Sequence, residues 1–87
     1  MEPGFRWINK QGVESTEGFV VQFTGRFILR YQNGSFVMDC PVDHGSPYLT
    51  VAVPEIPFGN LTPKIRSEIV QRISAALSFM KVDHVIQ

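Results

Sequence analysis

TPKIRSEIVQRISAALSFMK, running from Thr62 to Lys81, is the stretch that decides the fold of this chain. Thr62 has a hydroxyl that can cap a helix, and Pro63 suits the first helical position because its missing N–H would have no partner there. At about 100° per residue, the apolar side chains of this helix fall on one broad side. They are Ile65, Ile69, Ile73, Ala76, Leu77, Phe79 and Met80. An apolar side this wide needs a partner surface, so we expect the rest of the chain to form a sheet under the helix.

Three segments before the helix are rich in β-branched and aromatic residues, which is typical of strands. They are Phe19–Phe23, Arg26–Tyr31 and Phe36–Cys40. Asn33-Gly34 predicts a two-residue hairpin turn between the second and third segments. A three-residue loop, Phe23–Gly25, would join the first two segments in the same register. The face we expect under the helix then carries Phe19, Val21, Phe27, Leu29, Tyr31, Phe36, Met38 and Cys40.

The remaining segments complete a small single domain over residues 1–87. We predict a short strand at Phe5–Asn9, a fourth main strand at Tyr48–Val53 and a last short strand at Val82–Ile86. Lys10–Gly18 and Pro41–Pro47 are turn-rich and predict loops. The predicted fold is α+β: a mainly antiparallel sheet of four to five strands, one long C-terminal helix packed on one face, and a short final strand.

Composition and charge narrow the range of functions. Eight basic residues balance eight acidic ones, and a net charge of zero argues against nucleic acid as the partner. The single cysteine, Cys40, cannot form an internal disulfide, which is consistent with a reducing compartment. The sequence has neither a secretory signal pattern nor a run near the ~20 apolar residues of a membrane span. We therefore expect a cytoplasmic protein with no membrane partner.

The residues that could carry chemistry do not form a convincing catalytic or metal site. Cys40 continues the apolar register of Phe36 and Met38, which predicts a buried, inert thiol instead of a nucleophile. The Asp39–His44 segment contains potential metal ligands, but zinc sites need three or four ligands with recognisable spacing. We therefore expect no catalytic residue, no metal, no cofactor and no enzymatic activity.

The second face of the predicted sheet offers a possible binding surface. Val20, Ile28 and Val37 form a small apolar strip between charged groups, and an apolar centre with a polar rim is how interfaces are built. Either the N-terminal segment with Phe5 and Trp7 covers this strip, or the strip binds a partner. The candidate partner-binding residues are Arg26, Arg30, Asp39, Asp43 and Glu55. An alternative is a small nucleic-acid-binding or regulatory domain that uses the Arg26/Arg30 face; a small enzyme is a third.

The C-terminal segment LTPKIRSEIVQRISAALSFMKVDHVIQ resembles the end of immunity protein family 74 of bacterial polymorphic toxin systems. The matching residues are Leu61, Thr62, Arg66, Ile69, Arg72, Ile73, Ala76, Leu77 and Phe79. The resemblance implies a non-enzymatic protein that binds a cognate toxin domain in the cytoplasm and occludes its active site. It leaves the toxin's activity unspecified, and self-association of the chain stays open.

Overall fold

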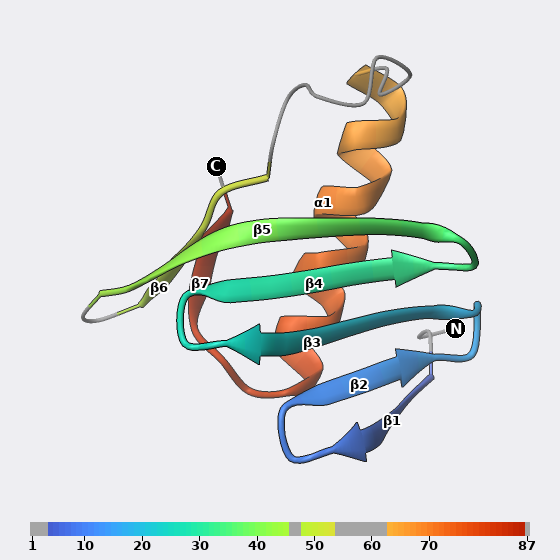
Figure 1. Ribbon diagram of the computed structural model, residues 1–87, viewed down its shortest axis with the longest axis horizontal. Coiled ribbons are helices and arrows are strands. Elements are labelled where there is room, and N and C mark those ends of the chain that lie inside the picture. Colours follow the sequence, from blue (N-terminus) through green and yellow to red (C-terminus); the bar gives the residue numbers. More distant parts are fainter. Residues whose placement is uncertain (1–3, 46–47, 54–62, 87) are drawn as a thin grey trace.

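The computed structural model describes residues 4–45, 48–53 and 63–86, and these form one sheet and one helix (Figure 1). The strands are β1 (Phe5–Asn9), β2 (Gly12–Ser15), β3 (Phe19–Gly25), β4 (Ile28–Asn33), β5 (Phe36–His44), β6 (Leu49–Val51) and β7 (His84–Ile86). They lie side by side in chain order, antiparallel except for the parallel pair of β6 and β7. Parallel neighbours need a crossover connection, and the helix α1 (Pro63–Phe79) lies within it.

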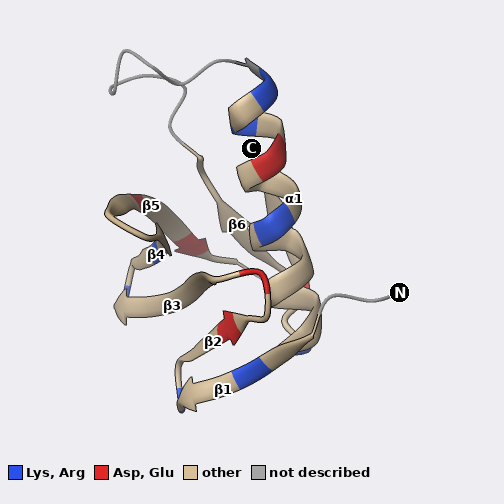
Figure 2. Cartoon of the chain, turned by 90° about the vertical axis from the view of Figure 1, so that its right-hand side faces the viewer, with Lys and Arg blue, Asp and Glu red and all other residues tan. Residues whose placement is uncertain are grey.

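The prediction of a four- to five-stranded sheet with a long helix on one face is wrong. Within the described ranges the sheet has seven strands and curls into a half-barrel, and α1 lies in its concave side (Figures 1 and 2). The predicted helix Thr62–Lys81 is shorter, ending at Phe79. The chain is thus mostly sheet, and one helix fills the hollow of a strongly curved surface.

One whole strand and the end of another escaped prediction, because β2 lies in the predicted loop Lys10–Gly18 and β5 runs past its predicted end at Cys40. The sequence of β2 is GVES, in which Val13 is the only large apolar residue, so it lacks an alternating pattern. The prediction of a loop at Pro41–Pro47 is wrong because β5 continues through Pro41 to His44. The carbonyl of Pro41 accepts a hydrogen bond from the Ala52 N–H at 2.9 Å, so the backbone nitrogen of Pro41 also faces the β6 side. This position lies beyond the last β5–β6 pair, Val42 with Val51, so the absence of an N–H on Pro41 costs no hydrogen bond of the ladder.

Both hairpins are shifted from their predicted registers by an even number of residues. Val21 pairs with Tyr31 instead of Phe27, and Tyr31 pairs with Met38 instead of Phe36. An even shift keeps each side chain on its face, because side chains alternate with a period of two. Phe27 is the exception: it lies in the β3–β4 turn and is 58% exposed, so its predicted place under the helix is wrong.

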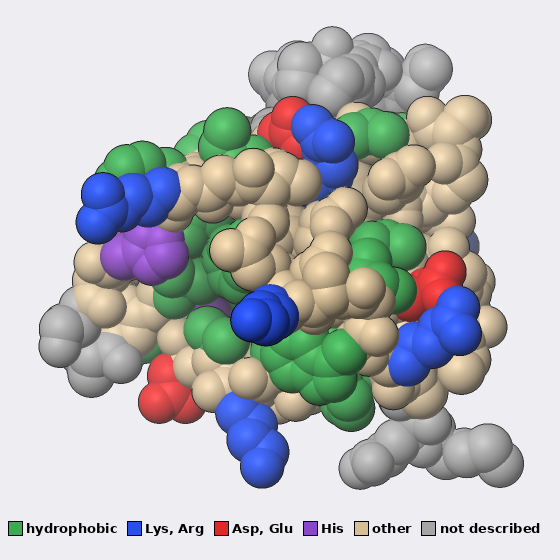
Figure 3. Space-filling view, turned by 60° about the horizontal axis from the view of Figure 1, so that its bottom comes forward, with side chains coloured by type: hydrophobic (Ala, Val, Ile, Leu, Met, Phe, Trp, Pro, Cys, Tyr) green, Lys and Arg blue, Asp and Glu red, His purple; other side chains and the backbone are tan. Residues whose placement is uncertain are grey.

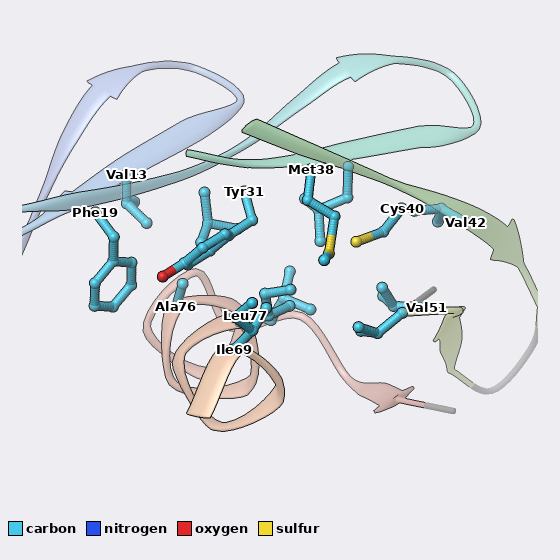
Figure 4. Packing of buried hydrophobic residues seen from close by; sticks show 14 of the residues in the cluster. Val13, Phe19, Tyr31, Met38, Cys40, Val42, Val51, Ile69, Ala76 and Leu77 are labelled. Atoms are coloured by element: carbon cyan, nitrogen blue, oxygen red, sulfur yellow. The ribbon is translucent and has the colours of Figure 1, made fainter. Parts of the chain in front are cut away.

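The core lies between the concave side of the sheet and α1 (Figure 4). The sheet contributes Val13, Phe19, Val21, Leu29, Tyr31, Met38, Cys40, Val42, Leu49 and Val51, and the helix contributes Ile69, Ile73, Ala76 and Leu77. Arg72 stabilises the edge of this core: its guanidinium donates a hydrogen bond to the Tyr31 hydroxyl at 2.9 Å and lies 5.4 Å from the Phe19 ring centroid.

The helix ends in a Schellman-type cap built on a lysine. Lys81 has φ of 62°, a left-handed conformation that usually belongs to glycine at this position. The Val82 N–H donates to the Leu77 carbonyl at 3.0 Å, and the Lys81 N–H donates to the Ser78 carbonyl at 3.1 Å. These two bonds satisfy the last helical carbonyls and turn the chain toward β7.

Candidate functional site

The candidate site is the convex surface of β4 and β5 together with the β3–β4 turn, and we call it the outer face. Alternation along β5 places Val37, Asp39, Pro41 and Asp43 on this face, because Met38, Cys40 and Val42 between them are buried. Strand β4 contributes Ile28, Arg30 and Gln32 opposite them. The predicted residues Arg30, Asp39 and Asp43 are therefore brought onto one surface.

Arg30 and Asp39 form an ion pair in the middle of the outer face. They are direct cross-strand partners, and the Arg30 Nε donates a hydrogen bond to the Asp39 carboxylate at 2.8 Å. A second, longer bond runs from Nη2 to the other carboxylate oxygen at 3.4 Å. The side-chain hydrogen bond is the main cause that raises the pKa of Arg30 and lowers the pKa of Asp39. The two charges largely neutralise each other, so this part of the face presents a fixed dipole, not a net positive patch.

The β3–β4 turn adds exposed apolar surface at one end of the outer face. Phe27 and Ile28 are 58% and 42% exposed. The Arg26 guanidinium carbon lies 6.0 Å from the Phe27 ring centroid, and the His44 ring packs edge-on against Phe27 at 5.9 Å. His44 also contacts the Arg26 carbonyl through Nε2, which fixes its ring beside the turn. This end of the outer face therefore combines an aromatic ring, an aliphatic side chain and a cation.

The predicted apolar strip of Val20, Ile28 and Val37 is not continuous. Val20 and Val37 both pair with Gln32, which lies between them. Ile28 lies on the other side of the Arg30–Asp39 pair. The apolar group that the structure assembles is instead Phe27, Ile28 and the exposed Pro41, the cross-strand partner of Ile28.

The alternative in which the N-terminal segment covers the second face is wrong. Strand β1 extends the sheet beyond β2 instead of folding over it. The Phe5 ring contacts Phe19 and Phe79 at centroid distances of 5.9 and 5.5 Å, and Trp7 contacts Phe79 at 6.1 Å. These aromatic side chains therefore lie toward the helix, away from the outer face.

Sequence reasoning placed some site residues and missed others. Arg26 lies at the turn, apart from the Arg30–Asp39 pair, and Glu55 lies outside the described residues. Phe27 was missed because a two-fold alternation counted it into the buried face. The sequence treats His44 as a potential metal ligand or a base near Cys40, and not as a binding residue. A turn placed at Arg26-Phe27 would have pointed to Phe27, because binding residues concentrate on loops; the sequence offers no such signal for His44.

The nucleophilic residues of the described chain are held in structural roles. Cys40 is fully buried, and burial raises the pKa of its thiol to about 11, with the Asp39 charge adding to the effect. Ser74 Oγ lies 2.9 Å from His84 Nε2, and His84 Nδ1 donates to the Val82 carbonyl at 2.8 Å. His84 lines the nearby cavity of 430 Å³, and Ser74 is not among its described lining residues; the hydrogen bond between the two ties α1 to β7.

The described residues contain neither a candidate metal site nor a helix that could cross a membrane. No three His, Cys, Asp or Glu side chains come together there in a way that could hold a metal ion. No helix within the described residues is long and apolar enough to cross a membrane.

No protein-family model matches this chain, and comparisons with curated proteins and with solved structures found no significant match.

Proposed function

We propose that this chain is an immunity protein that binds a cognate bacterial toxin domain through its outer face and occludes the toxin's active site. The observation that carries the proposal is the exposed group Phe27–Ile28 beside Arg26 and the Arg30–Asp39 pair. The resemblance of the C-terminal segment supplies the class of partner. The concave side of the sheet is filled by α1, so the sheet offers a protein partner its outer face.

The chemistry of this face suits a protein partner. Aromatic and arginine side chains dominate binding energy where they fill pockets on the partner, and surrounding polar groups exclude water. The platform is rigid, because β4 is hydrogen-bonded to β3 on one side and to β5 on the other. A rigid platform loses little conformational entropy on binding, which favours tight inhibition.

Growth rescue and direct binding test the proposal. The chain is co-expressed with candidate toxin domains encoded by neighbouring genes, and each purified pair is measured by calorimetry. Truncating Phe27 to Ala should weaken binding by about thirty-fold, as expected for an interface hot spot. Val85→Ala is the matched control, because Val85 is 41% exposed but lies on β7. If Phe27→Ala keeps its fold and binds the toxin domain with unchanged affinity, the outer face is excluded as the binding surface.

A charge-swap series separates binding from stability at the central ion pair. Arg30→Asp alone places two carboxylates opposite each other, whereas Arg30→Asp with Asp39→Arg restores the pair in reverse. We expect the double variant to recover the melting temperature but not the affinity, because the partner meets inverted charges. Recovery of both would mean that the partner does not contact this pair.

The nucleic-acid alternative gains no specific support, because Asp39 compensates the charge of Arg30. Basic and acidic positions are also interspersed along the part of the chain that faces the viewer in Figure 2. A mobility shift with nucleic acid that weakens steeply with salt would favour that alternative over toxin binding.

A further inference from the structure

A pocket of about 350 Å³ lies at the end of the half-barrel where the β1–β2 and β3–β4 turns meet the end of α1. Its apolar lining includes Trp7, Phe23 and Met80. Mouths of β-barrels are common ligand sites, and ligand pockets usually hold roughly 300–1,000 Å³. Figure 3 shows this end of the molecule, where hydrophobic side chains lie exposed between basic side chains and a histidine.

The two charged side chains among the described residues that line this pocket, Lys10 and Arg26, are both cationic. Lys10, Arg26 and His44 line it, and no Asp or Glu is among the described residues that do so. The chain as a whole is neutral, with eight basic and eight acidic residues, so this is a local concentration of basic groups. The contact between His44 Nε2 and the Arg26 carbonyl holds two of these residues together at the rim.

We propose that this pocket binds a small organic anion with an apolar body, such as an aromatic or long-chain acid. The apolar body packs against Trp7, Phe23 and Met80, and the acid group faces Lys10, Arg26 and His44. Burial of apolar surface supplies the affinity, and the three basic groups orient the ligand. The pocket shares Arg26 and His44 with the turn end of the outer face, whereas its other lining residues, among them Trp7 and Met80, lie outside that face.

The test uses a matched pair of probes, 1-anilinonaphthalene-8-sulfonate and the uncharged N-phenyl-1-naphthylamine. Trp7 is the only tryptophan, so a ligand in the pocket quenches its fluorescence directly. We expect the sulfonate to bind with quenching of Trp7 and the uncharged probe to bind at least several-fold more weakly. Equal binding of both probes, binding without a change at Trp7, or no binding up to roughly millimolar sulfonate would overturn the proposal.

Charge-removal variants identify the groups that recognise the anion. An exposed ion pair strengthens an affinity by up to about five-fold, so Lys10→Gln with Arg26→Gln should weaken sulfonate binding about ten-fold. Both residues are exposed, so the melting temperature should stay near that of the wild type. The control is Lys64→Gln, an exposed cation at the start of α1, which should leave the affinity unchanged. Equal losses of sulfonate affinity in the double variant and in Lys64→Gln would mean that only the net charge of the protein matters. That result would overturn the proposed site.

Discussion

Replacing Gly12 with alanine tests the close approach of β2 to β3. Gly12 begins β2 and pairs with Gln22 of β3. A Cβ at Gly12 would lie 2.3 Å from the Gln22 Cβ, 3.1 Å from the Gln22 Cα and 3.2 Å from the Val21 carbonyl oxygen. Two of these three atoms belong to the backbone, so a rotamer change cannot relieve the clash. The β2 and β3 backbones would have to separate.

The size of the effect follows from two opposing contributions. Alanine usually stabilises a compatible glycine site by about 0.4–1 kcal/mol, because it restricts the unfolded chain. Overpacking a tight contact costs about 1–3 kcal/mol. We expect Gly12→Ala to lower the free energy of unfolding by about 1–2 kcal/mol, or roughly 4–16 °C in melting temperature for a domain of this size. Gly25→Ala is the control, because its nearest contact would be Ile28 at 3.9 Å and its φ is not positive.

Thermal and urea unfolding followed by circular dichroism measure both variants. Gly25→Ala should be neutral or slightly more stable than the wild type, and Gly12→Ala clearly less stable. A Gly12→Ala variant as stable as Gly25→Ala would refute the close approach of β2 and β3, and with it the curl of the sheet at this hairpin.

Two further predictions concern the helix end and the buried thiol. Lys81→Gly should raise the free energy of unfolding by up to about 1 kcal/mol, because glycine adopts a φ of 62° without the left-handed penalty. Gln71→Gly on the exposed helix surface should lower the free energy of unfolding by about as much. A loss of stability in Lys81→Gly would contradict the cap. Burial raises the pKa of Cys40 from 9.0 to about 11, so its contribution to stability is full below pH 9 and is lost as the pH rises toward 11. Ionisation of the thiol thus lowers the free energy of unfolding by about 2–3 kcal/mol, and Cys40→Ala should not show this loss. If the free energies of unfolding of wild type and Cys40→Ala, measured in urea, changed in parallel with pH, this contribution of Cys40 would be excluded.

The sequence predicted side-chain faces better than strand pairing. Val21, Leu29, Tyr31 and Met38 are buried as predicted, although both hairpin turns are displaced. The β4–β5 turn has the predicted two residues but lies one residue later, and the β3–β4 turn has two residues instead of three. Burial depends on the two-fold alternation, which survives any even shift in register. The number of strands depends on backbone pairing. A segment such as β2 pairs through its peptide groups, and its side-chain pattern does not indicate this pairing. Curvature follows from close approaches such as that of Gly12 to Gln22, and only the folded chain reveals these.

The candidate site was predictable only in part, because charged residues can be assigned to a face but not to their partners. Alternation put Arg30 and Asp39 on the same surface, yet it did not show that they neutralise each other. The exposure of the Phe27 ring was not predicted, because Phe27 lies in the β3–β4 turn and the alternation of side chains along a strand does not hold there. Turn residues are therefore where pattern reasoning fails and where binding residues are concentrated.

The two proposed surfaces meet at Arg26, and this junction determines how they can be told apart. The Arg26 side chain lines the pocket and also lies over Phe27, so a change at Arg26 alone affects both surfaces. Lys10 lines the pocket on the β1–β2 turn, whereas Phe27 is not among the described residues around that pocket. Loss of sulfonate binding in Lys10→Gln with toxin binding intact, and the reverse in Phe27→Ala, would assign the pocket and the outer face to separate functions. The outer face and the pocket at the end of the half-barrel are the two surfaces proposed for binding, and these two variants probe one each.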